Sequence, residues 1–228
     1  MTTSTSNITE NFNLAAKNYD HYAVVQRHVI DYLFTLSKPH FKKTDLLLDG
    51  GSGTGYFQEV LRRNKLYLPL VQLDRAYNMC SIAKEYAAPK EYGGTYTVNS
   101  DLTQLPFAPH TFDGVFSSMT LHWMKDLPSV LSQLKQCIKK KGYYGFSFLS
   151  DGSLHELVTA AKDCNYSNLI NAFPTETDIC DALKQSGLHD YQLSEQVLTT
   201  NHEHATDILK MIKMIGARTK LSPSTSFI

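Results

Sequence analysis

The sequence predicts an α/β protein: an open, mostly parallel and doubly wound (Rossmann-like) sheet with helices on both faces and a small helical lid. Three observations predict this class. Short apolar segments that end in turn or acidic residues alternate with segments whose apolar residues recur at helical spacing. A glycine-rich turn follows the first apolar segment and opens a helix. The 228 residues are enough for one large domain with a buried core.

Five short apolar segments are predicted as buried strands, with helices between them. The strands are expected at 45–49, 68–74, 95–99, 112–118 and 143–149. The intervening helices are expected at 56–64, 76–86 and 127–138. Such alternation implies right-handed crossovers between parallel strands. The active site is therefore expected at the carboxyl ends of the strands, beside the first strand.

Further elements flank this repeat. A helix is expected ahead of it at 22–36, because Val25, Val29, Leu33 and Leu36 lie along one helical face. Behind it, helices are expected at 154–163, 176–185 and 204–215, and a sixth strand at 191–200. About the first ten residues are polar and are expected to be frayed.

Composition and charge exclude several classes of function. Lysine plus arginine equals aspartate plus glutamate at 22 each, so no net field attracts nucleic acid or an anionic membrane. No apolar run approaches the roughly 18 residues of a membrane span, and the N-terminus lacks a signal-peptide pattern. The four cysteines form no C-x-x-C pair, so neither a disulfide framework nor a metal site is indicated. We expect a cytoplasmic protein without a nucleic-acid or membrane partner.

The glycine turn is the strongest chemical signal. It contains Asp49, Gly51, Gly53 and Gly55, and it joins a strand to a helix whose free amides favour a polar or anionic ligand. The spacing matches neither the dinucleotide pattern G-x-G-x-x-G nor the phosphate-binding Walker A motif. Asp74 closes the next strand, where an acid can accept both ribose hydroxyls. A nucleoside that carries an amino acid suits this pattern; a turn without a ligand is the alternative.

These motifs, in this order, resemble the class I S-adenosylmethionine-dependent methyltransferases. Within that class the chain is most similar to the malonyl-acyl-carrier-protein O-methyltransferase family of biotin synthesis. The more discriminating segments are NFNLAAKNYDHYAVVQ, SSMTLHW, DGSLHEL and IKMIGAR. The resemblance implies S-adenosylmethionine as the cofactor. Members of the family usually carry a bulkier residue at position 50, often Cys at position 52, and a last strand that this sequence does not show. We expect that strand to be missing or replaced by an unusual pairing.

The resemblance also assigns cofactor contacts. Asp101 would contact the adenine amino group with Leu102 alongside, and Met79 would pack on the adenine. Tyr19 would cover the methionine end. The fourth-strand segment, with Ser117, would line the methyl-transfer pocket. Each assignment has a structural alternative: Asp74 and Asp101 as helix N-caps, Met79 as a core residue, and Tyr19 as the anchor of a loose arm.

The implied reaction is methyl transfer to the free carboxylate of malonyl-acyl-carrier protein or malonyl-coenzyme A. A carboxylate with a free pKa of about 4 is already ionised near neutral pH, so no general base is required. His122 is a base, a donor in the pocket wall or a loop residue, the base role being the least favoured, and Trp123 lies beside it. Arg218 is expected to pair with the acceptor carboxylate; a solvated helix cap is the alternative. Another small-molecule methyltransferase, or a cofactor-binding assembly protein without activity, remains open.

This interpretation divides the chain into four parts. Residues 1–40 form an N-terminal arm and helix that act as a lid. Residues 41–150 form the cofactor-binding α/β core. Residues 151–218 supply acceptor-side helices and the sixth strand, and 219–228 form a frayed tail.

Overall fold

The computed structural model describes residues 3–42, 45–164 and 172–217 of the chain. Its centre is a five-stranded sheet in the order β3-β2-β1-β4-β5, and every neighbouring pair is parallel. The strands are β1 (Leu47–Gly50), β2 (Leu70–Asp74), β3 (Thr95–Asn99), β4 (Phe112–Ser118) and β5 (Ile138–Ser147). The predicted fold class is confirmed, and the strand order reverses next to β1, where the glycine turn begins.

Eight α-helices occur in the described residues. They are α1 (Thr3–Tyr22), α2 (Val24–Ser37), α3 (Tyr56–Arg63), α4 (Tyr77–Glu85), α5 (Leu127–Cys137), α6 (His155–Asp163), α7 (Glu176–Gln185) and α8 (Ala205–Met214). Short 3-10 helices occupy η1 (Lys38–His40), η2 (Lys90–Tyr92) and η3 (Leu121–Trp123). Most predicted elements therefore exist, with ends displaced by a few residues.

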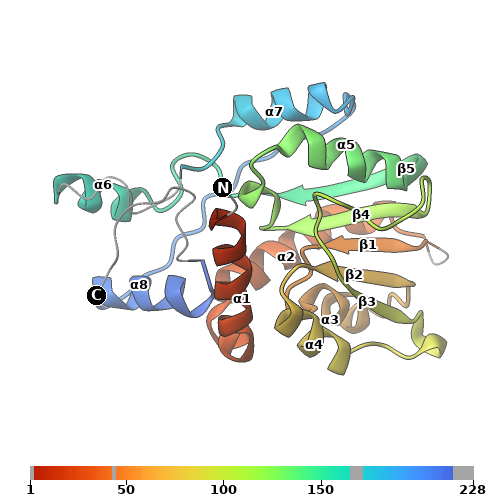
Figure 1. Cartoon of the computed structure of the whole chain (residues 1–228), viewed down its shortest axis with the longest axis horizontal. Helices are drawn as coiled ribbons and strands as arrows, with labels where there is room; N and C mark the ends of the chain where they lie inside the picture. The colour runs from red at the N-terminus through yellow and green to blue at the C-terminus, as the bar shows by residue number, and fades with distance from the viewer. Residues whose placement is uncertain (1–2, 43–44, 165–171, 218–228) are drawn as a thin grey trace.

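Alternation along the strands divides the core into two layers. Leu47 and Phe116 face α2 and α3, where they pack with Phe57. Leu48 and Val115 face the opposite layer, which α5 and α7 cover. Figure 1 shows α5 and α7 on one side of the sheet and α3 and α4 on the other. Strands buried on both faces explain their nearly continuous apolar sequences.

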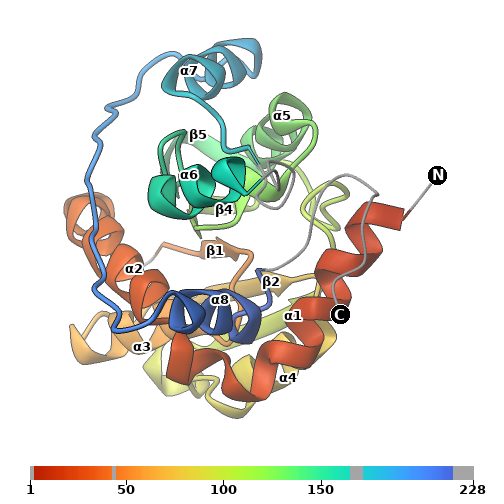
Figure 2. The ribbon, with the colours of Figure 1, turned by 90° about the vertical axis from the view of Figure 1, so that its left-hand side faces the viewer.

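Three helices lie off the carboxyl end of the sheet. In Figure 1, α1 crosses this end, and α6 and α8 project beyond it. Figure 2 looks onto this end and shows α8 beside α1, with α6 in front of the strands. The chain thus places additional helices at the edge where a parallel α/β sheet binds its ligand.

Two sequence-based expectations about these flanking segments are wrong. Residues 191–200 form no strand; they run as an exposed, extended segment between α7 and α8. The alternating pattern is compatible with a strand, but a strand also needs a neighbour for its backbone groups, and the described sheet ends at β5. The polar N-terminus is helical from Thr3, because α1 packs against α4 and α8. The predicted tail at 219–228 lies outside the described residues.

Phe57 and Phe116 test the packing between α3 and the sheet. Their rings stack with centroids 3.8 Å apart, and each residue is 1% exposed. Phe57→Ala should lower the free energy of unfolding by about 3–5 kcal/mol, because it leaves a cavity beneath β4. Urea denaturation measures this change. Tyr77→Ala, at a residue 65% exposed, should change stability by no more than about 0.5 kcal/mol; equal losses in both variants would contradict the assignment of Phe57 to the core.

Candidate active site

The glycine turn that follows β1 has a backbone geometry that only glycine adopts easily. Gly51, Gly53 and Gly55 have φ values of 76°, 54° and 89°. The amides of Gly51 and Ser52 both donate to the Leu73 carbonyl, at 2.7 and 3.0 Å. A Cβ added at Gly51 would collide with the Thr120 side chain. The turn is therefore held between the end of β2 and the segment that follows β4.

Two carboxylates, one buried and one half-buried, stand at the ends of β1 and β2. Asp74 accepts hydrogen bonds from the amides of Gly53 and Ala76, each at 2.8 Å. Burial raises the pKa of Asp74, and these backbone hydrogen bonds partly oppose the increase. Asp49 is 3% exposed, and its Oδ2 has no partner in the described chain. Burial, and secondly the charge of Asp74, raise the pKa of Asp49 well above its ordinary value.

A third acid follows β3. Asp101 accepts from the Thr103 amide at 2.9 Å and forms an ion pair with Arg75 at 3.1 Å. Leu102 is buried, and its Cδ2 would lie 3.1 Å from a Cβ added at Gly50. The glycine at position 50 therefore allows the residue after Asp101 to pack against the end of β1. Asp49, Asp74 and Asp101 thus occupy three adjacent strand ends, as predicted.

The first helix contributes an aromatic wall. The Phe12 ring lies 6.4 Å from that of Tyr19 and 5.9 Å, edge-on, from that of Trp123. Tyr19 and Phe12 also pack with Met79, which is 1% exposed. Phe12 was not singled out from the sequence. The available signal was its spacing of seven residues from Tyr19, which puts both rings on one face of a helix.

Polar contacts attach this helix to the core. The Thr54 hydroxyl donates to Asp20 at 2.6 Å, and Arg27 pairs with the same carboxylate at 3.3 Å. Asn13 accepts from the Asn78 amide at 2.8 Å. The Thr54 contact lies within the glycine turn itself, so the position of α1 and the shape of the turn are linked.

These features surround one large cavity of about 1750 Å³. Most predicted site residues line it: Tyr19, Gly51, Gly53, Asp74, Met79, Asp101, Leu102, His122 and Trp123. Asp49, Gly55 and Ser117 lie behind its wall. Ser117 is fully buried, and its hydroxyl donates to the Gly50 carbonyl at 2.7 Å; it supports the turn from below, whereas Ser118 reaches the cavity. Arg218 lies outside the described residues.

Comparison with known proteins identifies the family. Residues 48–146 match the model of a methyltransferase domain. A malonyl-acyl-carrier-protein O-methyltransferase of Gallionella capsiferriformans is 31% identical, over 90% of this chain and 72% of its own length. The Serratia marcescens enzyme of the same name is 32% identical, over 90% and 76%. The chain belongs to this methyltransferase family. It is an S-adenosylmethionine-dependent methyltransferase.

Solved structures support the same fold. A chain in a complex of the Haloferax volcanii Trm112 methyltransferase activator with a methyltransferase superposes with a TM-score of 0.68 at 18% identity, covering 90% of this chain and 92% of that one. An S-adenosylmethionine-dependent methyltransferase of Thermotoga maritima gives a TM-score of 0.57 at 18% identity, covering 78% and 80%. At this level of identity the similarity concerns the fold.

The residues of the methyltransferase cavity fit S-adenosylmethionine chemically. This cofactor carries a sulfonium and an ammonium group, and the three strand ends present carboxylates. Asp49 has a buried oxygen without a hydrogen-bond partner in the described chain, so a nearby cation would favour its ionised form. The open backbone at Gly53 has only Tyr19 Cε1 near an added Cβ, at 4.0 Å. The cavity also exceeds the roughly 300–1,000 Å³ of an ordinary ligand pocket, so it has room for a second molecule.

His122 also lines the methyltransferase cavity. The Leu149 amide donates to its Nδ1 at 3.5 Å, and the imidazole lies 5.4 Å from the Trp123 ring and 5.9 Å from the Phe173 ring. Burial lowers the pKa of His122 to about 4. The imidazole is therefore neutral near pH 7.

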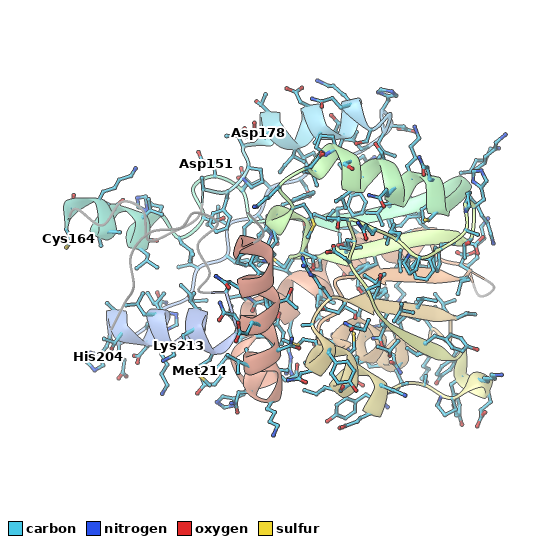
Figure 3. All side chains as sticks on the ribbon, in the orientation of Figure 1. Asp151, Cys164, Asp178, His204, Lys213 and Met214 are labelled. Atoms are coloured by element: carbon cyan, nitrogen blue, oxygen red, sulfur yellow. The ribbon has the colours of Figure 1, made fainter. Side chains whose placement is uncertain are left out.

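The remaining wall comes from the segments after β5. Both α6 and α8 contribute cavity-lining residues, among them Leu157, Ile208 and Ile212. Figure 3 shows His204 at the start of α8 and Lys213 at its end beside α1. Of the described lysines and arginines, those that line the cavity are Arg75, Lys125 and Lys213. This part of the wall thus combines apolar residues of α6 and α8 with polar side chains of the neighbouring loops.

No group of three or more His, Cys, Asp or Glu side chains in the described part of the chain is placed to hold a metal ion. No helix there is both long and apolar enough to cross a membrane.

The buried charge of Asp49 predicts a pH-dependent cost in stability. Folding raises the pKa of Asp49 above its ordinary value of 3.8. The protonated carboxyl therefore contributes stability that is fully present below the unfolded-state pKa. This stability is lost as pH rises through the folded-state pKa, because the carboxyl then has to ionise inside the protein. Asp49→Asn should therefore stabilise the ligand-free protein relative to wild type by an amount that grows as pH rises from the unfolded-state pKa through the raised folded-state pKa. Urea denaturation at several pH values measures the difference.

Asp178 provides the matched control for this experiment. Its exposed carboxylate accepts from the Thr175 amide and hydroxyl, and these hydrogen bonds lower its pKa. Asp178→Asn should therefore destabilise the protein at neutral pH, and its effect should fade as pH falls through the lowered pKa. An Asp49→Asn protein less stable than wild type at neutral pH would contradict the buried, unpaired charge.

Proposed function

We propose that the protein methylates the free carboxylate of a malonyl thioester, with malonyl-acyl-carrier protein as the acceptor and malonyl-coenzyme A as a smaller substitute. The observation that carries this proposal is the extent of the similarity. The relatives that bear this name match 90% of the chain, well beyond the methyltransferase domain at 48–146. Acceptor choice in such folds depends on the flanking segments, and those segments lie within the match.

We further propose how the chain holds the cofactor. The glycine turn lies along its methionine part, and Asp74 accepts from the ribose hydroxyls. Although each Asp74 oxygen already accepts one amide hydrogen bond, a carboxylate oxygen has a second lone pair for a hydroxyl. Asp101 accepts from the adenine amino group between Leu102 and Met79. Tyr19 covers the methionine end, and Asp49 contributes negative charge behind the turn.

In this proposal the chain's own residues position the reacting groups and exclude water from them. S-adenosylmethionine supplies an activated methyl group when it is bound. Because the acceptor carboxylate is ionised near pH 7, no side chain has to remove a proton. The protein accelerates the reaction by holding the nucleophile in line in a dry cavity. Phe12, Tyr19 and Trp123 shield that space from solvent.

The two flanking parts form the lid in this proposal. The arm at 1–40 closes the cofactor side, where Asp20 binds Thr54 of the turn. The acceptor-side residues 151–218 close the other half through α6 and α8. The core at 41–150 remains the rigid support. In the cell we place the enzyme in the cytoplasm and in biotin synthesis, where a methyl ester masks a charge that apolar elongation sites reject.

Mass spectrometry of malonyl-acyl-carrier protein tests the proposed reaction. Incubation with the enzyme and S-adenosylmethionine should add one methyl group, and cleavage of the thioester should release this methyl together with the malonyl group, because the methyl lies on the malonyl carboxylate. Acetyl-acyl-carrier protein, which lacks the free carboxylate, should remain unmodified. Methylation of both carriers, or of neither, would contradict the proposal.

Asp74→Asn tests the cofactor assignment directly. Calorimetry should show S-adenosylmethionine binding weakened by about 1.5–3 kcal/mol, the range for a hydrogen bond to a charged group. Asp113→Asn is the control: Asp113 also lies in a strand and accepts from a backbone amide, that of Leu46, at 2.9 Å. Unchanged affinity in the Asp74 variant would remove this residue from the cofactor site.

Tyr19→Ala tests the N-terminal lid. Loss of the ring should weaken cofactor binding, because the cavity opens to water on that side, whereas Tyr19→Phe should retain most of the affinity. Tyr22→Ala removes an aromatic side chain of the same helix that does not line the cavity. Equal calorimetric affinities for the Tyr19 and Tyr22 alanine variants would show that Tyr19 covers nothing important.

A further inference from the structure

The described lysines and arginines that line the cavity are either already paired or exposed to solvent, so none of them is a buried partner for a carboxylate. Arg75 is engaged with Asp101, and Lys125 and Lys213 are exposed. Thr120 donates within the chain, to the carbonyls of Gly51 and Ser118. An acceptor carboxylate that leaves water needs a hydrogen-bond partner inside the cavity.

His122 supplies such a hydrogen. The Leu149 amide donates to Nδ1 at 3.5 Å, so Nδ1 carries the lone pair and the proton of a neutral imidazole is on Nε2. The described chain offers Nε2 no hydrogen-bond partner, and the residue lines the cavity. Trp123 and Phe173 flank the ring. The Nε2–H is therefore an oriented donor without an internal acceptor.

We propose that the Nε2–H of His122 donates a hydrogen bond to one oxygen of the acceptor carboxylate and leaves the second oxygen free to attack. This inference rests on the proposed function and assigns the residue that recognises its substrate. The free oxygen forms the new bond to the methyl carbon, the bond from that carbon to sulfur breaks, and its electron pair remains on sulfur. No proton moves in this step, so His122 acts as a binding and orienting group.

A neutral donor suits this role better than a cation. Hydrogen bonds from charged donors are about twice as strong as neutral ones, and a guanidinium would engage both oxygens at once. A single neutral N–H orients the carboxylate while leaving one oxygen uncommitted. The ester product carries no charge and accepts a weaker hydrogen bond, which favours its release. Burial keeps the ring uncharged, as its lowered pKa indicates.

Three variants separate the donor from the ring. His122→Phe keeps an aromatic ring but removes both nitrogens, and His122→Met is a second removal variant should the first fold poorly. His122→Gln retains an N–H near the position of Nε2. Calorimetry with malonyl-coenzyme A and the spent cofactor S-adenosylhomocysteine measures acceptor binding without turnover, and methyl-transfer kinetics follow on the same proteins.

The removal variants should bind malonyl-coenzyme A about tenfold more weakly, or worse, while S-adenosylhomocysteine affinity changes by no more than about twofold. His122→Gln should recover most of the acceptor affinity, and the kinetic loss should appear mainly in KM. Wild-type acceptor affinity in both removal variants would overturn the inference and leave the proposed function intact. A kcat loss that glutamine does not rescue would assign His122 to proton transfer and also overturn it. A wild-type enzyme that methylates no malonyl thioester would instead overturn the proposed function.

Discussion

The hydrogen bond from the Gly53 amide to the Asp74 carboxylate, 2.8 Å long, joins the two strands that build the cofactor side of this protein. It turns the glycine loop toward β2 and fixes a carboxylate that burial would otherwise leave poorly stabilised. Asp49 lies close enough to Asp74 for the two charges to raise each other's electrostatic cost. In the proposed cofactor site, a bound cation would favour the ionised form of both carboxylates and offset this cost.

The aromatic wall depends on the same turn. Thr54 of the turn binds Asp20, so the turn and α1 are held as one unit. This contact helps to fix the position from which Phe12 meets Trp123 edge-on. The N-terminal helix is thus positioned by the cofactor loop as well as by its own packing on α4 and α8. A segment of high polarity becomes ordered because its few apolar residues lie on one face.

The parallel core could be predicted from sequence because each strand is an apolar run with a clear end, and the glycine and aspartate positions follow those ends. The carboxylates after β1, β2 and β3 were placed for this reason. Elsewhere the sequence does not tell which distant segments of the chain contact each other. The segment 191–200 has a strand-like alternation but no neighbouring strand, and the polar start of α1 is helical only through tertiary contacts. The roles of Ser117 and Phe12 depend on which way a side chain points, which no linear motif contains.

Thr120 occupies the space that a side chain at position 51 would need, and it lies two residues before His122. The glycine turn and the segment that carries His122 therefore share one point of contact. Thermodynamic linkage makes such a coupling reciprocal. If one ligand orders this contact and so raises the affinity for the second, the second raises the affinity for the first by the same factor. Under the proposed function, a cofactor on the glycine turn would order the segment that binds the acceptor, which favours binding of the cofactor first. A side chain at position 51 would consequently require a smaller residue at position 120.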